Sequence, residues 1–138
     1  MISLDYLDHL VLTVSDLDRT CEFYTAVLGC EVIFFGQDLC GKPRRALRIG
    51  PSQKINLHSA KQPMLPTAQV PQPGTADLCF LTKTPLTDVI GHFQHLAIPI
   101  VEGPVQRTGA QGSILSVYIR DPDGNLIEVA NPIHADSH

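Results

Sequence analysis

The sequence of 138 residues lacks the features that mark several large classes of protein. It has no basic excess, because 10 Lys and Arg stand against 14 Asp and Glu, so the neutralisation of phosphates that nucleic-acid binding requires is missing. No apolar run approaches the ~20 residues that span a bilayer. The first residues, MISLD, lack the basic and apolar regions of a signal peptide. We therefore expect a cytoplasmic protein whose partners include neither nucleic acid nor a membrane.

Cysteine is present without the spacing of a redox or zinc motif. The four cysteines, Cys21, Cys30, Cys40 and Cys79, include no C-x-x-C pair, and the chain is not a small disulfide-dense scaffold. We expect reduced thiols. Cys21 falls on the apolar face of a predicted helix and Cys79 inside a predicted strand, so both are predicted to be buried as small hydrophobic residues.

Signatures of several common enzyme classes are missing as well. The sequence contains no G-x-S-x-G, no H-E-x-x-H, no dinucleotide-binding fingerprint and no P-loop. Serine hydrolysis, zincin proteolysis and hydride transfer therefore lack support. What remains is an ordinary globular composition, 43% hydrophobic and 17% charged, in a chain of the length of one domain.

The chain repeats one supersecondary pattern twice. In the first half, hydrophobic periodicity and turn residues predict a strand, a helix and three strands. Ser15 is predicted as the helix N-cap, with Asp18 three residues later, and Gly29 as the C-cap. The five predicted elements are Leu7–Val14, Asp16–Leu28, Glu31–Phe35, Ala46–Ile49 and Lys54–His58.

The second half follows the same order after a segment that contains four prolines. Thr84 is predicted to cap its helix, with Pro85 in the first turn. The predicted elements are a strand from Asp77, a helix over 86–96, and the strands Ile98–Val101, Ser113–Ile119 and Leu126–Ala130.

This order predicts an α+β fold with two paired βαβββ modules. We place module one at about residues 5–60, the linker at about 61–74 and module two at about 75–131, all within one domain of residues 1–138. Each helix covers one face of its sheet and leaves the other face bare. The two modules are therefore expected to form a curved mixed sheet around a central cavity.

Four polar residues occupy matching positions in the two halves. His9 corresponds to Asp77 at the opening strand, and Asn56 corresponds to Glu128 in the closing Ile-polar-aliphatic strand. Since alternate residues of a strand share one face, these side chains are expected to converge in the cavity. Imidazole and carboxylate groups suit a divalent metal such as Zn, Ni, Mn or Fe(II). We predict His9, Asp77, Glu128 and Asn56 as metal ligands.

Taken one by one, these residues also allow other interpretations. Glu128 is compatible with the solvent face of an edge strand, and His9 with a hydrogen-bonded core histidine. The matching positions favour a shared site, and an unpaired charge among the apolar neighbours of Glu128 would be costly. His58 lies two residues beyond Asn56 and roughly 7 Å further along the same face, so it either replaces Asn56 or acts as an acid or base. Glu128 and His58 are the predicted catalytic residues.

Two further residues are predicted to contact substrate. Arg107 stands in the glycine-containing stretch 105–113, which is either a mobile loop that closes on an anionic substrate or an ordinary hairpin loop. Tyr118 either points its hydroxyl into the cavity or packs as a core aromatic. A basic cluster is predicted to be solvated surface and comprises Lys42, Arg44, Arg45 and Arg48.

Three segments, Asp8–Asp16, Phe23–Gly29 and Asp121–Glu128, together resemble the vicinal oxygen chelate superfamily. This group contains glyoxalase I, fosfomycin-modifying transferases, bleomycin resistance proteins and extradiol dioxygenases. A closer resemblance, to the glyoxalase domain-containing protein 5 type, rests on Lys54–His58, Gly74–Cys79 and Glu102–Ala110.

The resemblance implies paired βαβββ modules, a metal between them and often a homodimer. The family's first-strand ligand falls on His9 and its closing glutamate on Glu128. Asp77 stands where the family usually has histidine or glutamate, and Asn56 stands where glyoxalase I has glutamate. We predict a metal-dependent glyoxalase-like lyase or isomerase acting on a small oxygen-chelating substrate. The alternatives are a non-catalytic small-molecule binding or resistance protein of the same fold and, third, a dioxygenase.

Overall fold

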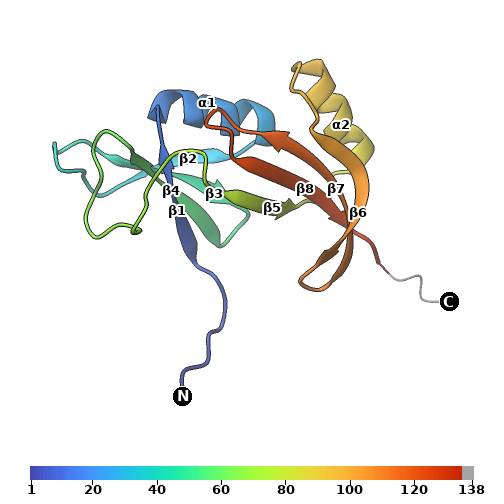
Figure 1. Cartoon of the computed structure of the whole chain (residues 1–138), viewed down its shortest axis with the longest axis horizontal. Helices are drawn as coiled ribbons and strands as arrows, with labels where there is room; N and C mark the ends of the chain where they lie inside the picture. The colour runs from blue at the N-terminus through green and yellow to red at the C-terminus, as the bar shows by residue number, and fades with distance from the viewer. Residues whose placement is uncertain (135–138) are drawn as a thin grey trace. The chain divides into compact units, whose positions relative to one another are not determined.

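A computed structural model describes residues 1–134 of the chain (Figure 1). The chain divides into two compact units, Met1–Pro73 and the part that begins at Gly74. Each unit contains one four-stranded sheet and one helix. The predicted α+β class and the order strand, helix, three strands in each half are confirmed.

The first unit contains a mixed sheet with the strand order β1-β4-β3-β2. The strand β1 runs parallel to β4, while β3 is antiparallel to both of its neighbours. The elements of this unit are β1 (His9–Val14), α1 (Leu17–Leu28), β2 (Glu31–Phe35), β3 (Arg44–Ile49) and β4 (Gln53–Ser59).

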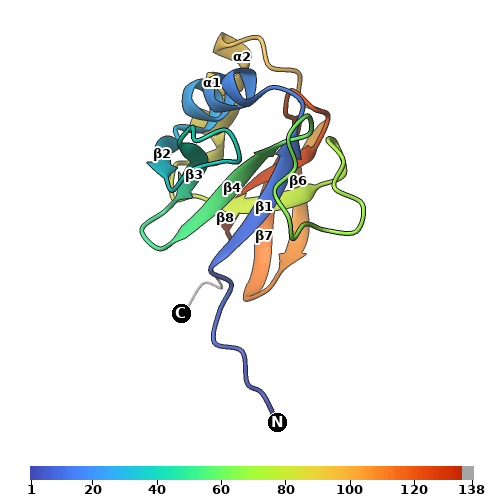
Figure 2. The same cartoon turned by 90° about the vertical axis from the view of Figure 1, so that its left-hand side faces the viewer.

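The helix α1 packs against one face of this sheet, as Figures 1 and 2 show. Tyr24 of the helix is fully buried, together with alternate apolar residues of the strands such as Leu12, Leu47 and Leu57. Because side chains alternate between the faces of a strand, the intervening residues lie on the opposite face, which α1 does not cover. We call this the bare face of the first unit.

The start of α1 differs from the prediction by one residue. Asp16, in extended conformation, is the N-cap, and its carboxylate accepts a hydrogen bond from the backbone N–H of Arg19 at 3.1 Å. The predicted Ser15 cap is therefore wrong, because the helix begins one residue later, at Leu17. Gly29 ends the helix in the left-handed conformation (φ 67°), as predicted.

The second unit repeats the same sheet, with the strand order β5-β8-β7-β6. The strand β5 runs parallel to β8, and β7 is antiparallel to β8 and β6. The elements of this unit are β5 (Asp77–Leu81), α2 (Leu86–His95), β6 (Glu102–Gly109), β7 (Gly112–Arg120) and β8 (Leu126–Pro132).

A distant side chain caps α2. The backbone N–H of Leu86 donates to Asn131 Oδ1 at 2.8 Å, and Asn131 Nδ2 donates to the carbonyls of Thr82 and Thr84 at 2.9 and 2.8 Å. Pro85 occupies the N-cap position and makes no side-chain cap hydrogen bond. The predicted Thr84 cap is thus wrong, since Asn131 of β8 supplies the acceptor.

The strand predicted at Ile98–Val101 is also wrong. The backbone N–H of Ile98 donates to the Phe93 carbonyl at 2.8 Å and closes the end of α2. The strand β6 begins only at Glu102, and its pairing with β7 shifts register between Glu102 and Val105.

No described helix is long and apolar enough to cross a membrane.

The strand registers give the two units corresponding positions. Asn56 lies opposite Val11 and Ala46, and Glu128 lies opposite Cys79 and Tyr118. Asn56 and Glu128 are thus the central residues of equivalent strand triplets. In the same way, His9 and Asp77 are the first residues of the two parallel edge strands. The two residues of each pair that the sequence repeat matched therefore occupy equivalent positions, one in each sheet.

Candidate active site

The bare face of the second unit is the face of its sheet opposite α2. Glu128 lies at its centre, on β8, between β5 and β7. The interpretation of Glu128 as an edge-strand residue is therefore wrong. Cys79 and Tyr118 lie opposite Glu128 on the two neighbouring strands, so their side chains share this face.

Three donors surround the Glu128 carboxylate. Ser116 is fully buried, and its hydroxyl donates to Glu128 Oε2 at 2.5 Å. The Cys79 thiol and the Tyr118 hydroxyl also hydrogen-bond Glu128. Burial, and then the charge of Glu128, raises the pKa of the Cys79 thiol to about 11, so this thiol stays protonated at neutral pH. Burial also raises the pKa of Tyr118, against the opposing effect of the nearby Arg107.

Arg107 extends this hydrogen-bond network to β6. Its Nε donates to the Tyr118 hydroxyl and its Nη2 to Glu102 Oε1, both at 3.2 Å. The guanidinium carbon lies 5.7 Å from the centre of the Tyr118 ring. Tyr118 therefore points into the site, and the core-aromatic interpretation is wrong.

The predictions of a mobile loop or a hairpin loop around Arg107 are wrong. The strands β6 and β7 pair from Val105 with Ser116 to Gly109 with Gly112, and Arg107 lies opposite Ile114 within this ladder. Only Ala110 and Gln111 remain between the strands. Arg107 is held by strand pairing and by two side-chain hydrogen bonds.

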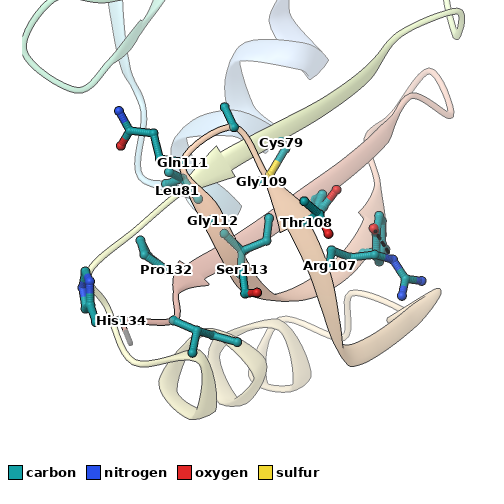
Figure 3. Close-up of a pocket in the computed structure, with 15 residues that line it drawn as sticks. Cys79, Leu81, Arg107, Thr108, Gly109, Gln111, Gly112, Ser113, Pro132 and His134 are labelled. Atoms are coloured by element: carbon teal, nitrogen blue, oxygen red, sulfur yellow. Dashed lines mark hydrogen bonds between the residues drawn. The ribbon is translucent and has the colours of Figure 1, made fainter. Parts of the chain in front are cut away.

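A pocket of about 850 Å³ opens over these residues (Figure 3). Cys79, Glu128 and Tyr118 line it together with Arg107 and the turn of the β6–β7 hairpin. The predicted burial of Cys79 as a small hydrophobic residue is wrong, because the residue as a whole is exposed on this face, although the atoms around its thiol remove enough water to raise the pKa. Cys21, in contrast, is buried on α1 as predicted.

On the first unit, His9 is oriented by its neighbour in the sequence. His9 Nδ1 lies 2.7 Å from Asp8 Oδ2, and the His9 side chain is 44% exposed. The core-histidine interpretation is therefore wrong. In the tautomer that donates from Nδ1 to this carboxylate, Nε2 carries the lone pair, which is the usual arrangement of a metal-binding histidine.

Asn56 is the clearest anomaly of the first unit. It is only 5% exposed, and its side-chain oxygen Oδ1 is buried without a hydrogen-bond donor. A buried acceptor without a partner costs about 1 to 3 kcal/mol, so such groups in native proteins usually have a functional reason. The equivalent position in the second unit is that of Glu128.

His58 lies on the same face as Asn56 and contacts Arg44. Arg44 Nη2 donates to His58 Nε2 across 3.2 Å. Burial and the charge of Arg44 lower the pKa of His58 below its usual value of 6.5. His58 is therefore neutral at physiological pH, and its one acceptor nitrogen, Nε2, is occupied by the Arg44 N–H.

Two of the four residues of the predicted basic cluster are paired with carboxylates, so the cluster is not simply solvated surface. Arg45 Nη1 lies 2.6 Å from Asp18 Oδ1, and Arg48 Nε lies 3.2 Å from Glu31 Oε2. Arg44 is half-buried. These pairings join strands β2 and β3 to each other and β3 to α1, and the sequence spacing alone did not indicate them.

The predicted ligands fall on two units. His9, Asn56 and His58 belong to the first unit, while Asp77, Glu128, Arg107 and Tyr118 belong to the second. Within residues 1–134, no three His, Cys, Asp or Glu side chains gather into a metal-binding group. Asp77 lies two residues before Cys79 and adds to the negative potential that acts on that thiol.

Sequence reasoning missed three contributors, namely Cys79, Ser116 and Asp8. The alternation of side chains between the two faces of β5 was a usable signal for Cys79, because residues two positions apart, such as Asp77 and Cys79, lie on the same face. Asp8 adjoins His9 in the sequence. Nothing local indicated Ser116, because its contact with Glu128 depends on the pairing of β7 with β8.

Comparison with known proteins gives consistent matches. A family model described as "Glyoxalase/Bleomycin resistance protein/Dioxygenase superfamily" matches residues 6–129. "Virulence protein STM3117" of Salmonella typhimurium is 54% identical over 127 residues, which cover 92% of this chain and 84% of that protein. Its crystal structure has a TM-score of 0.87 at 50% identity and covers 96% of this chain and 100% of that one.

One further relative is named for a glyoxalase domain, and one further solved structure is named a lyase. "Glyoxalase domain-containing protein RDO1" of Mycosarcoma maydis is 52% identical over 130 residues, 94% of this chain and 70% of that protein. The crystal structure of a lactoylglutathione lyase from Agrobacterium tumefaciens has a TM-score of 0.68 at 26% identity, with 93% of this chain and 94% of that one covered.

Proposed function

Because the chain belongs to the glyoxalase/bleomycin resistance protein/dioxygenase superfamily, we propose that it is a metal-dependent enzyme of the glyoxalase-like lyase or isomerase type. Its substrate would be a small molecule that chelates through two neighbouring oxygens. The observation that carries this proposal is the pair of equivalent oxygens at Glu128 and Asn56. The first is a carboxylate in a pocket, and the second is a buried amide oxygen without a donor.

The side chains present fit a divalent cation. An imidazole nitrogen of His9 and oxygens of Asp77, Glu128 and Asn56 form a mixed nitrogen and oxygen donor set, which suits Zn, Ni, Mn or Fe(II). A cation would satisfy Asn56 Oδ1, and Asp8 already orients His9. The proposal requires side chains of both units to share one ion, whether within one chain or between two.

The residues of the chain would hold the substrate and move its proton. Such an ion supplies Lewis acidity, which stabilises negative charge on a substrate oxygen. Neutral His58 would accept a proton at Nε2 once Arg44 releases that nitrogen, and Glu128 is the second candidate for this role. Arg107 and Tyr118 line the pocket and would orient substrate through their N–H and O–H groups.

Several finer proposals accompany this one. We also propose the glyoxalase domain-containing protein 5 type. The printed name of the relative RDO1 supports a glyoxalase domain, and that of the lactoylglutathione lyase supports lyase chemistry. A homodimer and a cytoplasmic location complete the proposal. The second candidate function is a small-molecule binding or resistance protein, which the size of the pocket also allows. Dioxygenase chemistry is third.

Metal analysis separates the enzyme from the binding protein. The full chain is purified without chelator, exposed in turn to Zn, Ni, Mn and Fe(II), and analysed by mass spectrometry for bound metal. We expect close to one metal per chain for at least one of the four ions. Less than about 0.2 metal per chain with every ion would instead favour the binding protein.

The substitution Glu128→Gln tests the predicted ligand. Loss of the carboxylate charge is expected to weaken metal affinity by at least the roughly 10- to 100-fold that loss of an outer-shell partner costs, measured by competition with a chelating dye. Glu22→Gln, on the exposed side of α1, makes the same chemical change and should leave the affinity unaltered. Equal affinity of Glu128→Gln and the wild type would remove Glu128 from the ligand set.

A further inference from the structure

The bare face of the first unit carries two cations without a carboxylate partner. Its residues include Arg48, which is paired with Glu31, and also Arg44 and Lys54. No ion pair joins Arg44 or Lys54 to an acidic side chain within residues 1–134. This face therefore holds uncompensated positive charge, whereas the equivalent face of the second unit carries Asp77 and Glu128.

Both cations are gathered around one aromatic ring. The guanidinium carbon of Arg44 lies 4.6 Å from the centre of the Phe35 ring, and Lys54 Nζ lies 3.6 Å from the same centre. The distance between the Arg44 guanidinium carbon and Lys54 Nζ is therefore at most the sum of these two distances. The ring attracts each cation, but the cations repel each other, and a bound anion would relieve that repulsion.

Arg44 is held in place with a donor unused. Its Nη2 donates to neutral His58, and the Phe35 ring lies beside its guanidinium. Its Nε is buried and has no acceptor. A buried guanidinium N–H without an acceptor is costly, and a carboxylate or phosphate oxygen is the acceptor that arginine binds best.

The second unpartnered group on this face is Asn56. It lies between Lys54 and His58 on β4, is 95% buried, and has a vacant Oδ1. One face of two strands therefore presents an unused donor, an unused acceptor and two unpaired cations. A small anionic ligand would match the donor and the two cations, and it would lie beside the acceptor that the proposed metal ion would occupy.

We propose that Arg44 and Lys54 form a subsite for the anionic group of the substrate, a carboxylate or a phosphate. This inference rests on the proposed function and specifies its substrate class: a small oxyanion-bearing molecule whose chelating oxygens lie next to the charged group. Arg44 and Lys54 supply the two positive charges, and Phe35 with His58 keeps the guanidinium oriented. The buried Arg44 Nε reaches the anion once the side chains that cover it move aside.

Nuclear magnetic resonance on the metal-free full chain tests this subsite. Malonate and inorganic phosphate are titrated separately, and the Arg44 Nε–H signal is followed, with the neutral analogue malonamide as a control ligand. We expect a saturable shift with at least one anion and none with malonamide. The anion that binds more tightly identifies the charged group as carboxylate or phosphate. The absence of a saturable shift with both anions would overturn the proposal.

Substitutions distinguish a subsite from general charge attraction. Arg44→Gln and Lys54→Gln should each weaken anion binding by about tenfold, measured by calorimetry or by backbone amide shifts of β4. Arg48→Gln removes the same charge from the same strand face, but Arg48 already has Glu31 as partner, so little change is expected. Equal weakening by all three substitutions would reduce the effect to net charge and reject the subsite.

These experiments distinguish failure of the anion subsite from failure of the proposed metal-dependent enzyme. Lys54→Gln lies at a half-buried surface position and is expected to fold, as circular dichroism would verify, even if Arg44→Gln does not. Both variants should retain the wild-type metal content. Failure of metal binding in the wild type with intact anion binding contradicts the enzyme, whereas intact metal binding without anion binding contradicts the subsite.

Discussion

At the scale of single residues, the site consists of polar groups held by unequal numbers of partners. Glu128 receives three donors, and the Ser116 hydroxyl among them contacts Oε2 directly. Asn56, in the equivalent position, receives no donor at its oxygen. The two equivalent positions of the repeated fold therefore differ in chemistry: Glu128 is a hydrogen-bonded anion, and Asn56 is a neutral acceptor without a donor.

His58 gives the protein a dependence of stability on pH. Its folded-state pKa lies below its usual value of 6.5, so the unfolded chain binds the proton more readily than the folded chain does. The free energy of unfolding is therefore expected to fall as the pH drops from about 6.5 toward the lowered pKa. Above this window His58 is neutral in both states and contributes no slope.

Urea unfolding at about pH 7.5 and pH 5 measures this effect. The wild type should lose more stability on acidification than His58→Gln. His95→Gln, an exposed histidine at the end of α2, is the matched control and should keep the wild-type slope. Identical slopes for His58→Gln and the wild type would contradict the assignment to His58.

At the scale of elements, close backbone contacts position the strands of the second unit. A Cβ atom on Gly103 would lie 2.5 Å from the Ser116 carbonyl oxygen and 2.9 Å from Val117 Cα. Gly103 also has φ 111°, which side-chain-bearing residues rarely adopt. The register shift of β6 occurs here, two strands away from Glu128, and lets β6 approach β7 closely.

The substitution Gly103→Ala is expected to lower the free energy of unfolding by about 1 to 3 kcal/mol, because the backbone must shift to remove the overlap. Gly91→Ala is the control, since Gly91 lies within α2 with no neighbour near its added Cβ. That variant should gain about 0.5 to 1 kcal/mol, as alanine favours the helix. Urea unfolding measures both, and a Gly103→Ala protein as stable as the wild type would refute the close-contact argument.

At the scale of the whole molecule, the segment before β1 leaves large apolar side chains exposed. Ile2, Leu4 and Tyr6 are 86%, 90% and 77% exposed. In Figure 2 this segment leads away from the sheet of the first unit. Exposed apolar groups of this kind are typical of surfaces that bind another protein chain.

We expect a homodimer in solution, since apolar groups at exposed positions gain stability when a second copy of the chain covers them. Sedimentation equilibrium of the full chain at about 10 µM should give twice the chain mass of 15.1 kDa. Replacing Leu4 and Tyr6 with Asp should shift the equilibrium toward the monomer. A wild-type protein that sediments as a monomer at this concentration would contradict the prediction.

The sequence by itself determined the order of the elements and the position of all of them except β6, which it placed at Ile98–Val101 instead of Glu102–Gly109. Secondary structure follows patterns among residues that are only a few positions apart, namely hydrophobic periods of two or 3.6 residues with glycines and prolines between them. These patterns therefore located β1, α1, β5 and α2 to within about two residues. The internal repeat also identified Asn56 and Glu128 as equivalent, because both lie in strands with the same local pattern.

Only the tertiary structure decided which groups meet. The cap of α2 by Asn131, the hydrogen bond from Ser116 to Glu128 and the placement of Arg44 against Phe35 and His58 all join residues on separate elements. Such contacts depend on strand register and on which face each side chain occupies. No local pattern specifies a register, because a slip of one residue leaves the sequence unchanged and moves every side chain to the opposite face.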